Sequence, residues 1–494
     1  MINLHIPNWL DKRAYLTPNK EAIVLNQNES YTFYELQQHA KSFATFLKHQ
    51  GVKQGDHIGL LSTNCYEMVV TIHALHYIGA VTFLLNVRLK EDELLFQLKD
   101  GNIQTVIHHP NLTEKVNGLK KQHELKAIHF NELPRKGIKD VELIDEMNLD
   151  DVSHIIYTSG TTGNPKGVQL TYGNHWWSAT ASALNLGLHE TDRWLLSLPL
   201  FHVGGLSILY RSVIYGMPIH LHEQYDLEAV YTDIMKNGVT IVSVVTVMLE
   251  ELVNRLQDDH FPDTLRCMLL GGGPASKSLL EKCRDKRIPV YQSYGMTETA
   301  SQFCTLDGDN MLTKIGSAGK PLFPGQLKIV KNDRECSIRE VGEIVVKGPS
   351  VTKGYWNRKD ANESSFIEEW FKTGDLGYFD EDGYLYVVDR RKDLIISGGE
   401  NVYPAEIESV LKGIVGIKDA GVVGVDDDKW GQVPVAFIVA SQPLEKETII
   451  EECQKALANY KVPKQIMFVD ELPRNASKKL MRHKLIDFLT KEGE

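Results

Sequence analysis

The sequence predicts a large N-terminal domain of α/β sheets with a β-rich subdomain, followed by a small α+β C-terminal domain. Helix and strand signals alternate along most of the chain, which is typical of sheets covered by helices. Beyond Gly316 the pattern changes to short strands between Gly and Pro turns. A dense run of charge at residues 389–393 precedes a region with its own strand and helix pattern. We therefore expect domains at residues 1–388 and 389–494.

The composition is that of a large globular protein. A chain of 494 residues exceeds what one hydrophobic core usually organises. Its 54 basic and 65 acidic residues give a net charge of −11, which argues against nucleic acid and anionic membranes as partners. The six cysteines lie far apart, without metal-ligand spacing. No secretory signal is visible, and the most apolar stretch, residues 68–85, falls short of a membrane span. We expect a cytoplasmic protein.

Local signals place the elements of the first 150 residues. Thr32 and Glu35 form a capping-box pair ahead of apolar residues at helical spacing, and Gly51 can end that helix. Asn64 and Glu67 are expected to open the next helix. The other predicted elements are strands at 57–61, 81–85, 105–107 and 152–157, and a helix at 91–99.

The same alternation continues after residue 168. Strands are predicted at 194–197, 219–221, 240–244 and 266–270, and helices from Val203 and at 227–236. In the β-rich region we expect strands at 326–330 and 343–346.

Residues 157–168 have the composition of a phosphate-binding loop. Three glycines allow tight turns that bring backbone N–H groups near an anion, four hydroxyls add donors, and one lysine adds positive charge. These residues are Thr158, Ser159, Gly160, Thr161, Thr162, Gly163, Lys166 and Gly167. The Walker A motif does not fit, because Pro165 occupies its second glycine position and Gly167 its hydroxyl position.

Further motifs follow this loop along the chain. They are Pro199 to Gly205 around His202, Gly271 to Pro274, Tyr294 to Thr299, Thr373-Gly374-Asp375, Asp389 to Asp393, and Pro473 to Arg482. Together with the loop they resemble the acyl-activating (ANL) superfamily of adenylate-forming enzymes, and the resemblance spans most of the chain. It implies the ANL fold, in which the small C-terminal domain is mobile, and two half-reactions. A carboxylate first attacks ATP to give an acyl-adenylate and pyrophosphate, and a thiol then displaces AMP.

The resemblance also implies a role for individual residues. His202 gates the acyl pocket, Gly272 lines the adenine pocket, Tyr294 stacks on adenine, Thr297 contacts the adenylate phosphate, Glu298 holds Mg²⁺, Asp375 and Arg390 contact the ribose, and Lys392 is the hinge. Ser293 and Gly295 are expected beside the nucleotide, and Gly398 and Gly399 beside the pantetheine arm of coenzyme A.

Lys479 is expected to be the catalytic lysine. The family pattern has glycine before this lysine, whereas Lys478 stands there in this sequence. The following Leu480-Met481-Arg482 matches the residues that succeed the catalytic lysine, and this match selects Lys479.

Polar side chains near the acyl motif suggest an acid with a second polar or anionic end. A fatty-acid tunnel should be apolar, yet His202, Ser207, Arg211, Ser293 and Gln302 are predicted to line this pocket. The two stretches look most like those of family members that activate 2-succinylbenzoate for menaquinone biosynthesis. The alternatives are that these groups cap and pair locally, and that the substrate is another aryl or medium-chain acid.

Other function classes remain open at this point. A non-catalytic adenylate sensor would have lost reactive positions, but Glu298, Asp375, Arg390 and Lys479 are all present. A luciferase-like oxidative enzyme would need oxygen. The expected partners are a small carboxylate, ATP with Mg²⁺, and coenzyme A as the free thiol, with no nucleic acid and no integral membrane segment. The sequence leaves open whether the chain forms a homo-oligomer.

Overall fold

The computed structural model describes residues 4–491 except for 27–28, 133, 135–140, 159–164, 273–274, 333, 390–393 and 474–479. The chain forms two compact units. The first contains Met1–Val87, Leu98–Ile156 and Gly167–Val388, and the second contains Arg88–Gln97, Tyr157–Lys166 and Asp389–Glu494. This is the mixed α/β architecture, with a small α+β C-terminal region, that the sequence predicts.

One sheet has six strands in the order β10-β9-β5-β4-β6-β7. The strands are β4 (His57–Leu61), β5 (Val81–Leu85), β6 (Thr105–His108), β7 (Lys126–His129), β9 (Val152–Thr158) and β10 (Lys166–Thr171). The helices in this part of the sequence are α1 (Trp9–Leu16), α2 (Phe33–His49), α3 (Tyr66–Ile78), α4 (Glu91–Asp100) and α5 (Thr113–Lys120). The Thr32–Glu35 capping box forms as predicted.

A larger sheet of fifteen strands crosses the rest of the first unit. Its parallel part runs β15-β14-β13-β11-β12-β2, and these strands are β2 (Glu21–Asn26), β11 (Trp194–Leu196), β12 (Ile219–Leu221), β13 (Ile241–Val244), β14 (Cys267–Leu270) and β15 (Val290–Met296). Strand β3 (Glu29–Thr32) pairs antiparallel with β2, and β16 (Ser301–Leu306) antiparallel with β15. The predicted strand positions agree closely with the observed ones.

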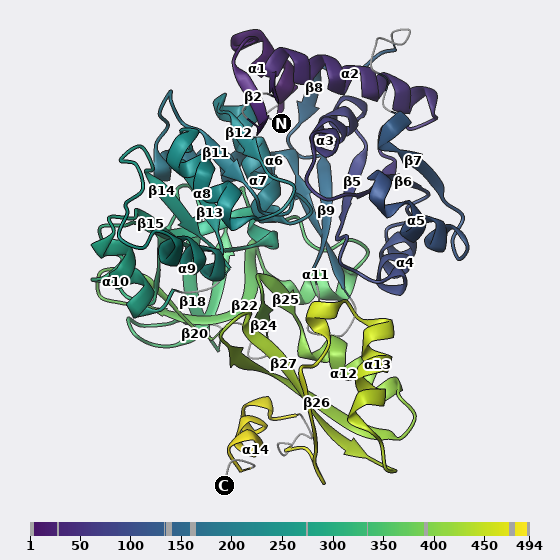
Figure 1. Ribbon diagram of the computed structural model, residues 1–494, viewed down its shortest axis with the longest axis vertical. Coiled ribbons are helices and arrows are strands. Elements are labelled where there is room, and N and C mark those ends of the chain that lie inside the picture. Colours follow the sequence, from purple (N-terminus) through teal and green to yellow (C-terminus); the bar gives the residue numbers. More distant parts are fainter. Residues whose placement is uncertain are drawn as a thin grey trace. The chain divides into compact units, whose positions relative to one another are not determined.

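Helices pack on the parallel part of this sheet (Figure 1). Helices α8 (Leu227–Lys236), α9 (Thr246–Arg255) and α10 (Lys277–Asp285) share one apolar core with β11, β13, β14 and β15. Helices α6 (Tyr172–Leu186) and α7 (Val203–Tyr215) belong to the main core, which also contains residues of α1, α2, α3 and both sheets. Helix α7 therefore lies among buried elements, which fixes the side chains that it carries.

The predicted β-rich region completes the larger sheet. Its elements are β17 (Ser317–Pro321), β18 (Gln326–Lys331), β19 (Arg334–Glu335), β20 (Gly342–Lys347), α11 (Lys359–Ser365), β21 (Phe366–Ile367), β22 (Trp370–Phe379) and β23 (Leu385–Asp389). A separate two-stranded sheet pairs β1 (His5–Pro7) with β8 (Glu146–Asn148).

The second unit contains a five-stranded sheet. Its elements are β24 (Ile395–Ser397), β25 (Glu400–Val402), α12 (Pro404–Gly413), β26 (Ile417–Asp427), β27 (Gly431–Ala440), α13 (Lys446–Ala456), β28 (Gln465–Phe468) and α14 (Ile486–Lys491). Helices α12 and α13 share an apolar core with the sheet. In the described part of the chain, no helix combines the length and the apolar character that crossing a membrane requires.

One local prediction was wrong. Asn64 does not cap α3, because the helix begins after Cys65 and no side chain caps it. Instead, the Asn64 amide donates to the carbonyls of Leu198 and His222 at 3.0 and 3.1 Å and accepts from the Leu200 N–H at 2.8 Å. The side chain thus holds the segment that leads to His202.

Candidate active site

Several predicted site residues follow neighbouring parallel strands of the larger sheet. His202 follows β11, Gly272 follows β14, and Glu298 follows β15. In parallel sheets the loops after neighbouring strands leave from the same edge, where ligands bind. The order of β11, β13, β14 and β15 therefore brings these three motifs to one edge of the sheet.

At the predicted nucleotide end of the site, Asp375 and Tyr294 form a buried pair. The Tyr294 hydroxyl donates to Asp375 Oδ2 at 2.8 Å, and Asp375 is only 5% exposed. Thr373 Oγ1 accepts from the Asp375 N–H at 3.1 Å and donates to the Ile344 carbonyl at 2.7 Å. The carboxylate predicted for the ribose is therefore held in place by hydrogen bonds before any ligand binds.

Glycine is required within the nucleotide motif. A Cβ at Gly295 would lie 2.0 Å from the Ser301 carbonyl oxygen, because β15 and β16 approach closely at a bulge. The turn between the two strands holds Ala300 at φ 53° and Ser301 at φ 111°. Positive φ at two non-glycine residues stores backbone strain, which often accompanies functional sites. Ser293 lies on the same strand, and its hydroxyl donates to the Leu270 carbonyl at 2.9 Å.

Glu298 offers a single carboxylate for a cation. It lies in the short 3₁₀ turn Thr297–Thr299 after β15 and is 3% exposed. The Tyr355 hydroxyl donates to Glu298 Oε1 at 2.8 Å. Within the described ranges, no group of three or more metal-ligating side chains occurs. A divalent cation here would be held by one carboxylate together with phosphate oxygens, which is how Mg²⁺ commonly binds with nucleotides.

The phosphate loop connects β9 to β10, two neighbouring strands of the six-stranded sheet. Thr158 is the last residue of β9 and Lys166 the first of β10. Ser159, Gly160, Thr161, Thr162 and Gly163 lie outside the described residues. Their predicted contacts with phosphate stay predictions.

At the predicted acyl end of the site, His202 is the N-cap residue of α7. Its backbone N–H donates to the Pro199 carbonyl at 3.1 Å. Gly205 permits a close approach here, because a Cβ at this position would lie 2.3 Å from the Pro199 carbonyl oxygen. Tight backbone packing therefore fixes the position of the predicted gate.

The predicted polar pocket is partly assembled. Ser207 and Arg211 of α7 face Ser301 of β16, whose hydroxyl lies 3.2 Å from Ser207 Oγ and 3.4 Å from Arg211 Nη2. Arg211 is 1% exposed, and its guanidinium carbon lies 5.0 Å from the ring centre of Trp194. Burial lowers the Arg211 pKa. Among the described residues, no carboxylate pairs with Arg211, and the Gln302 amide makes no hydrogen bond.

A group of uncharged histidines packs around Tyr210, the residue next to Arg211 on α7. The Tyr210 hydroxyl lies 3.0 Å from Nε2 of both His76 and His154. Burial lowers the pKa of His73 and of His175 to about 3, and it lowers those of His76 and His154 well below 6.5. These imidazoles are therefore neutral at physiological pH.

In the second unit, the glycines predicted for coenzyme A form a tight hairpin turn. Gly398 and Gly399 connect β24 to β25 with φ of 58° and 83°, a conformation that favours glycine. A Cβ at Gly398 would lie 2.8 Å from the Trp430 ring. Arg390 and Lys392 lie outside the described residues.

Lys479 also lies outside the described residues, but the segments on either side of it are anchored. The Met481 N–H donates to the Pro473 carbonyl at 2.8 Å, which closes the base of the loop. Arg482 donates to both carboxylate oxygens of Glu408 at 2.9 and 2.7 Å. A bidentate pair of this kind fixes geometry as well as charge.

Sequence patterns gave no signal for some residues that complete the site. Tyr355 contacts Glu298, and Trp194 contacts Arg211. The members of each pair are separated in the sequence, so they meet only in the folded chain. For Asn64 the sequence did predict a role, but the predicted role was that of a helix cap, whereas the side chain bonds to the Leu200 N–H.

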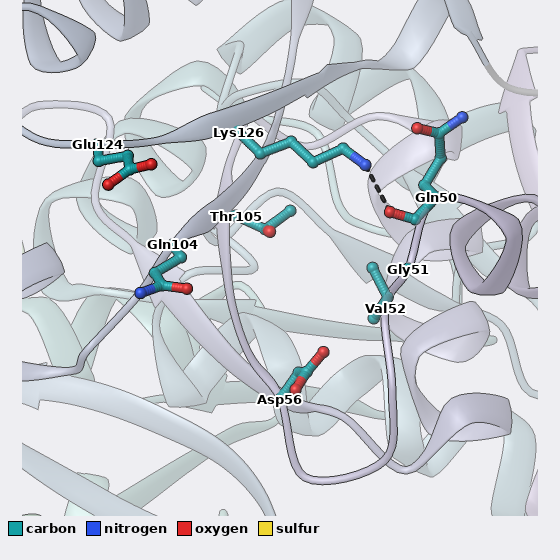
Figure 2. Close-up of a pocket in the computed structure, with 8 residues that line it drawn as sticks. All are labelled: Gln50, Gly51, Val52, Asp56, Gln104, Thr105, Glu124 and Lys126. Carbon is teal, nitrogen blue, oxygen red and sulfur yellow. Dashed lines mark hydrogen bonds between the residues drawn. The ribbon is translucent and has the colours of Figure 1, made fainter.

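A polar pocket elsewhere in the first unit contains none of the predicted site residues. Figure 2 shows its lining, in which Lys126 reaches the Gln50 carbonyl. Its volume is about 380 Å³, and it is lined by Gln50, Gly51, Val52, Asp56, Gln104, Thr105, Glu124 and Lys126. No chemistry predicted from the sequence involves this pocket.

Comparison with known proteins identifies the family. The family model of the AMP-binding enzyme matches residues 10–356, and that of the AMP-binding enzyme C-terminal domain matches residues 406–479. The 2-succinylbenzoate–CoA ligase of Oceanobacillus iheyensis is 53% identical over 481 residues, which cover 97% of this chain and 98% of that protein.

Two solved structures of o-succinylbenzoate CoA synthetase from Bacillus subtilis are also similar. A double mutant bound to a product analogue has a TM-score of 0.94 at 47% identity and covers 98% of each chain. The complex with ATP and magnesium has a TM-score of 0.77 at 46% identity, covering 98% of this chain and 100% of that chain. Since the first family model matches more than half of the sequence, this chain belongs to the family of AMP-binding enzymes.

Proposed function

We propose that the protein is an AMP-forming acid–CoA ligase that converts 2-succinylbenzoate to its CoA thioester, as the names of its relatives state for those proteins. The supporting observation within this chain is Arg211. A fully buried guanidinium without a carboxylate partner among the described residues is costly. The second carboxylate of 2-succinylbenzoate would supply that partner.

In the first half-reaction, we assign charge neutralisation and positioning to the chain. Glu298 and the hydroxyls and N–H groups of the phosphate loop would hold the nucleotide phosphates with Mg²⁺. Asp375 would accept hydrogen bonds from the ribose hydroxyls, and its pairing with Tyr294 supports this role. Bound Mg²⁺ would neutralise charge where two anions meet. His202 would lie beside the reacting acyl group.

At the other end of the acid, we assign the second carboxylate to Arg211, Ser207 and Gln302. Ser301 already links Ser207 to Arg211 through its hydroxyl. The unpartnered Gln302 amide is a ready donor for the same group. A site of this kind rejects acids that lack the second carboxylate, because its buried polar groups would then stay unpaired.

We assign the catalytic lysine to Lys479, in a C-terminal domain of residues 389–494, and the passage of the thiol to Gly398 and Gly399. Lys479→Ala is expected to abolish acyl-adenylate formation and to largely spare thioester formation from supplied acyl-adenylate. Single-turnover assays of each half-reaction measure the two effects. Equal loss in both half-reactions would contradict the assignment.

The substrate is tested with a panel of carboxylic acids in a pyrophosphate-release assay, with and without coenzyme A. We expect 2-succinylbenzoate to be preferred. A preference for another aryl or medium-chain acid would overturn the substrate and leave the ligase class. Binding of ATP and acids without pyrophosphate release would instead indicate a non-catalytic binding protein. We also propose that the enzyme is cytoplasmic, where ATP and coenzyme A are available to it.

A further inference from the structure

Glu298 has no cationic partner within the described ranges, although it is almost fully buried. A buried carboxylate is costly unless it is hydrogen-bonded or paired. The hydroxyl of Tyr355, at 2.8 Å from Oε1, is the one side-chain donor that contacts it among those residues. The second oxygen, Oε2, accepts no hydrogen bond there.

Because the partner of Glu298 is a tyrosine, the negative charge of the site is not neutralised. A lysine or arginine would neutralise Glu298 and compete with a cation for it. A neutral O–H donor stabilises the carboxylate and leaves its full negative charge. The pair of Tyr355 with Glu298 therefore satisfies one oxygen and keeps the other available to a metal.

The backbone around Tyr355 is fixed from both sides. Its N–H donates to the Asn362 side-chain oxygen at 2.7 Å, and the Asn362 amide donates back to its carbonyl at 2.9 Å. The residue is 2% exposed. The Thr352 N–H, three residues earlier, donates to the backbone carbonyl of Glu298 at 2.7 Å. The hydroxyl is thus held in a set position relative to the carboxylate.

The same segment, residues 352–356, is tied to β10, which follows the phosphate loop in the chain. The Gln169 N–H donates to the Gly354 carbonyl at 3.0 Å, and the Trp356 N–H donates to the Gly167 carbonyl at 2.7 Å. Val168 and Tyr355 form a β-bridge. Segment 352–356 therefore links the carboxylate to the strand that leaves the phosphate loop.

We propose that Tyr355 is a positioning residue that orients Glu298 so that Oε2 is available to the cation of a bound metal–ATP complex. This inference rests on the proposed function, since it concerns the metal that accompanies ATP. It predicts that Tyr355 affects nucleotide binding only where a metal takes part.

The test measures Mn²⁺ binding to the protein–ATP complex by electron paramagnetic resonance, and AMP binding by calorimetry without metal. Tyr355→Phe removes only the hydroxyl. We expect it to weaken Mn²⁺ binding about tenfold, the typical effect of losing one hydrogen bond to a charged group, and to leave AMP affinity unchanged. Tyr225→Phe is the matched control, because Tyr225 also loses one hydroxyl bond, to the Met248 carbonyl.

A double-mutant cycle tests whether Tyr355 acts through Glu298. In a Glu298→Gln background, Tyr355→Phe should change Mn²⁺ binding no further. Wild-type Mn²⁺ affinity in Tyr355→Phe, or an equal loss of AMP and Mn²⁺ binding, would overturn the inference. If the wild-type protein itself bound neither ATP nor Mn²⁺ with ATP, the proposed function would fail instead, so the two failures are distinguishable.

Discussion

At the nucleotide end of the candidate site, Asp375 and Glu298 each accept a hydrogen bond from a buried tyrosine, whereas at the acyl end Arg211 and Gln302 keep polar groups that the described residues do not satisfy. The first arrangement holds both carboxylates in place before any ligand binds, with Glu298 Oε2 left for a cation. The second leaves a buried charge and a buried amide for which a ligand must supply partners. Both ends lie in the same unit, beside the paired strands β15 and β16.

This difference indicates where affinity and selectivity arise. Preorganised carboxylates bind their ligand groups with little rearrangement, so the nucleotide end should contribute affinity. Unpaired buried groups penalise every ligand that cannot satisfy them, so the acyl end should contribute selectivity. Substitutions at the two ends should therefore change different measurements.

The largest expected effect is at Arg211. Arg211→Met should lower kcat/KM for 2-succinylbenzoate by roughly 100-fold or more, because losing one partner of a buried charge pair typically costs about 2–5 kcal/mol. It should barely change kcat/KM for 4-oxo-4-phenylbutanoate, which lacks the second carboxylate. Steady-state kinetics with both acids measure the difference.

Arg266 provides the matched control for this substitution. It is a partly buried arginine that has its own carboxylate, Asp192, at 2.6 Å. Arg266→Met should reduce stability without altering the preference between the two acids. If Arg211→Met reduced the rates of both acids equally, the acyl end would not be the source of selectivity.

The next effect is at Tyr294, on the opposite end. Tyr294→Phe removes the donor to Asp375 Oδ2 and should weaken ATP and AMP binding alike by about tenfold, since a hydrogen bond to a charged group contributes about 1.5 kcal/mol or more. Calorimetry with and without Mg²⁺ checks this. A loss confined to ATP with Mg²⁺ would show that Asp375 does not serve the ribose. Substrate preference among acids should stay unchanged.

Local sequence signals predicted much of the fold and supplied the motifs of the candidate site. Strands such as His57–Leu61 and Val81–Leu85, helix Leu227–Lys236 and the Thr32 capping box depend on neighbours in the sequence, and all of them were predicted correctly. The pairing of strands into sheets depends on distant residues and was predicted only as a fold class.

The pairing of site residues could not be predicted in the same way. Tyr355 and Glu298 are 57 positions apart, and Tyr294 and Asp375 are 81 apart, so no periodic pattern links them. The prediction that Asn64 caps a helix was wrong because an asparagine side chain can hydrogen-bond either to a nearby helix end or to a distant segment. Its real partners, Leu198, Leu200 and His222, lie more than 100 residues along the chain.

The buried histidines near Tyr210 also make stability depend on pH. The histidines around Tyr210 have lowered pKa values in the folded state, so the unfolded chain binds protons first as the pH falls below about 6.5. Their contribution to stability is complete above that pH and is lost below it. For each such histidine, the free energy of unfolding falls by up to about 1.4 kcal/mol for every pH unit below 6.5.

His175→Phe should reduce this loss. The free energy of unfolding, measured with denaturant between pH 7 and pH 5, should fall less steeply in the variant than in the wild-type protein. His260→Gln serves as the control, because His260 is exposed and its substitution should leave the slope unchanged. Identical slopes in all three proteins would mean that the histidine group takes up protons without unfolding.

The smallest expected effect is at Gln302, where one substitution should raise stability and weaken the selectivity for 2-succinylbenzoate. Neither the nitrogen nor the oxygen of its buried amide has a partner among the described residues, and such groups cost about 1–3 kcal/mol. Gln302→Met has a similar shape without those groups, so it should raise the free energy of unfolding by about 1 kcal/mol while raising KM for 2-succinylbenzoate severalfold. Denaturant unfolding and steady-state kinetics measure the two changes. Thr299, buried on the neighbouring turn, is the contrasting position, because its hydroxyl accepts from the Met296 N–H at 2.9 Å and has the Met296 and Ser301 carbonyls within reach of its one proton. Thr299→Val should therefore lower stability, and a Gln302→Met variant that was also less stable would show that the acyl end is satisfied without its ligand.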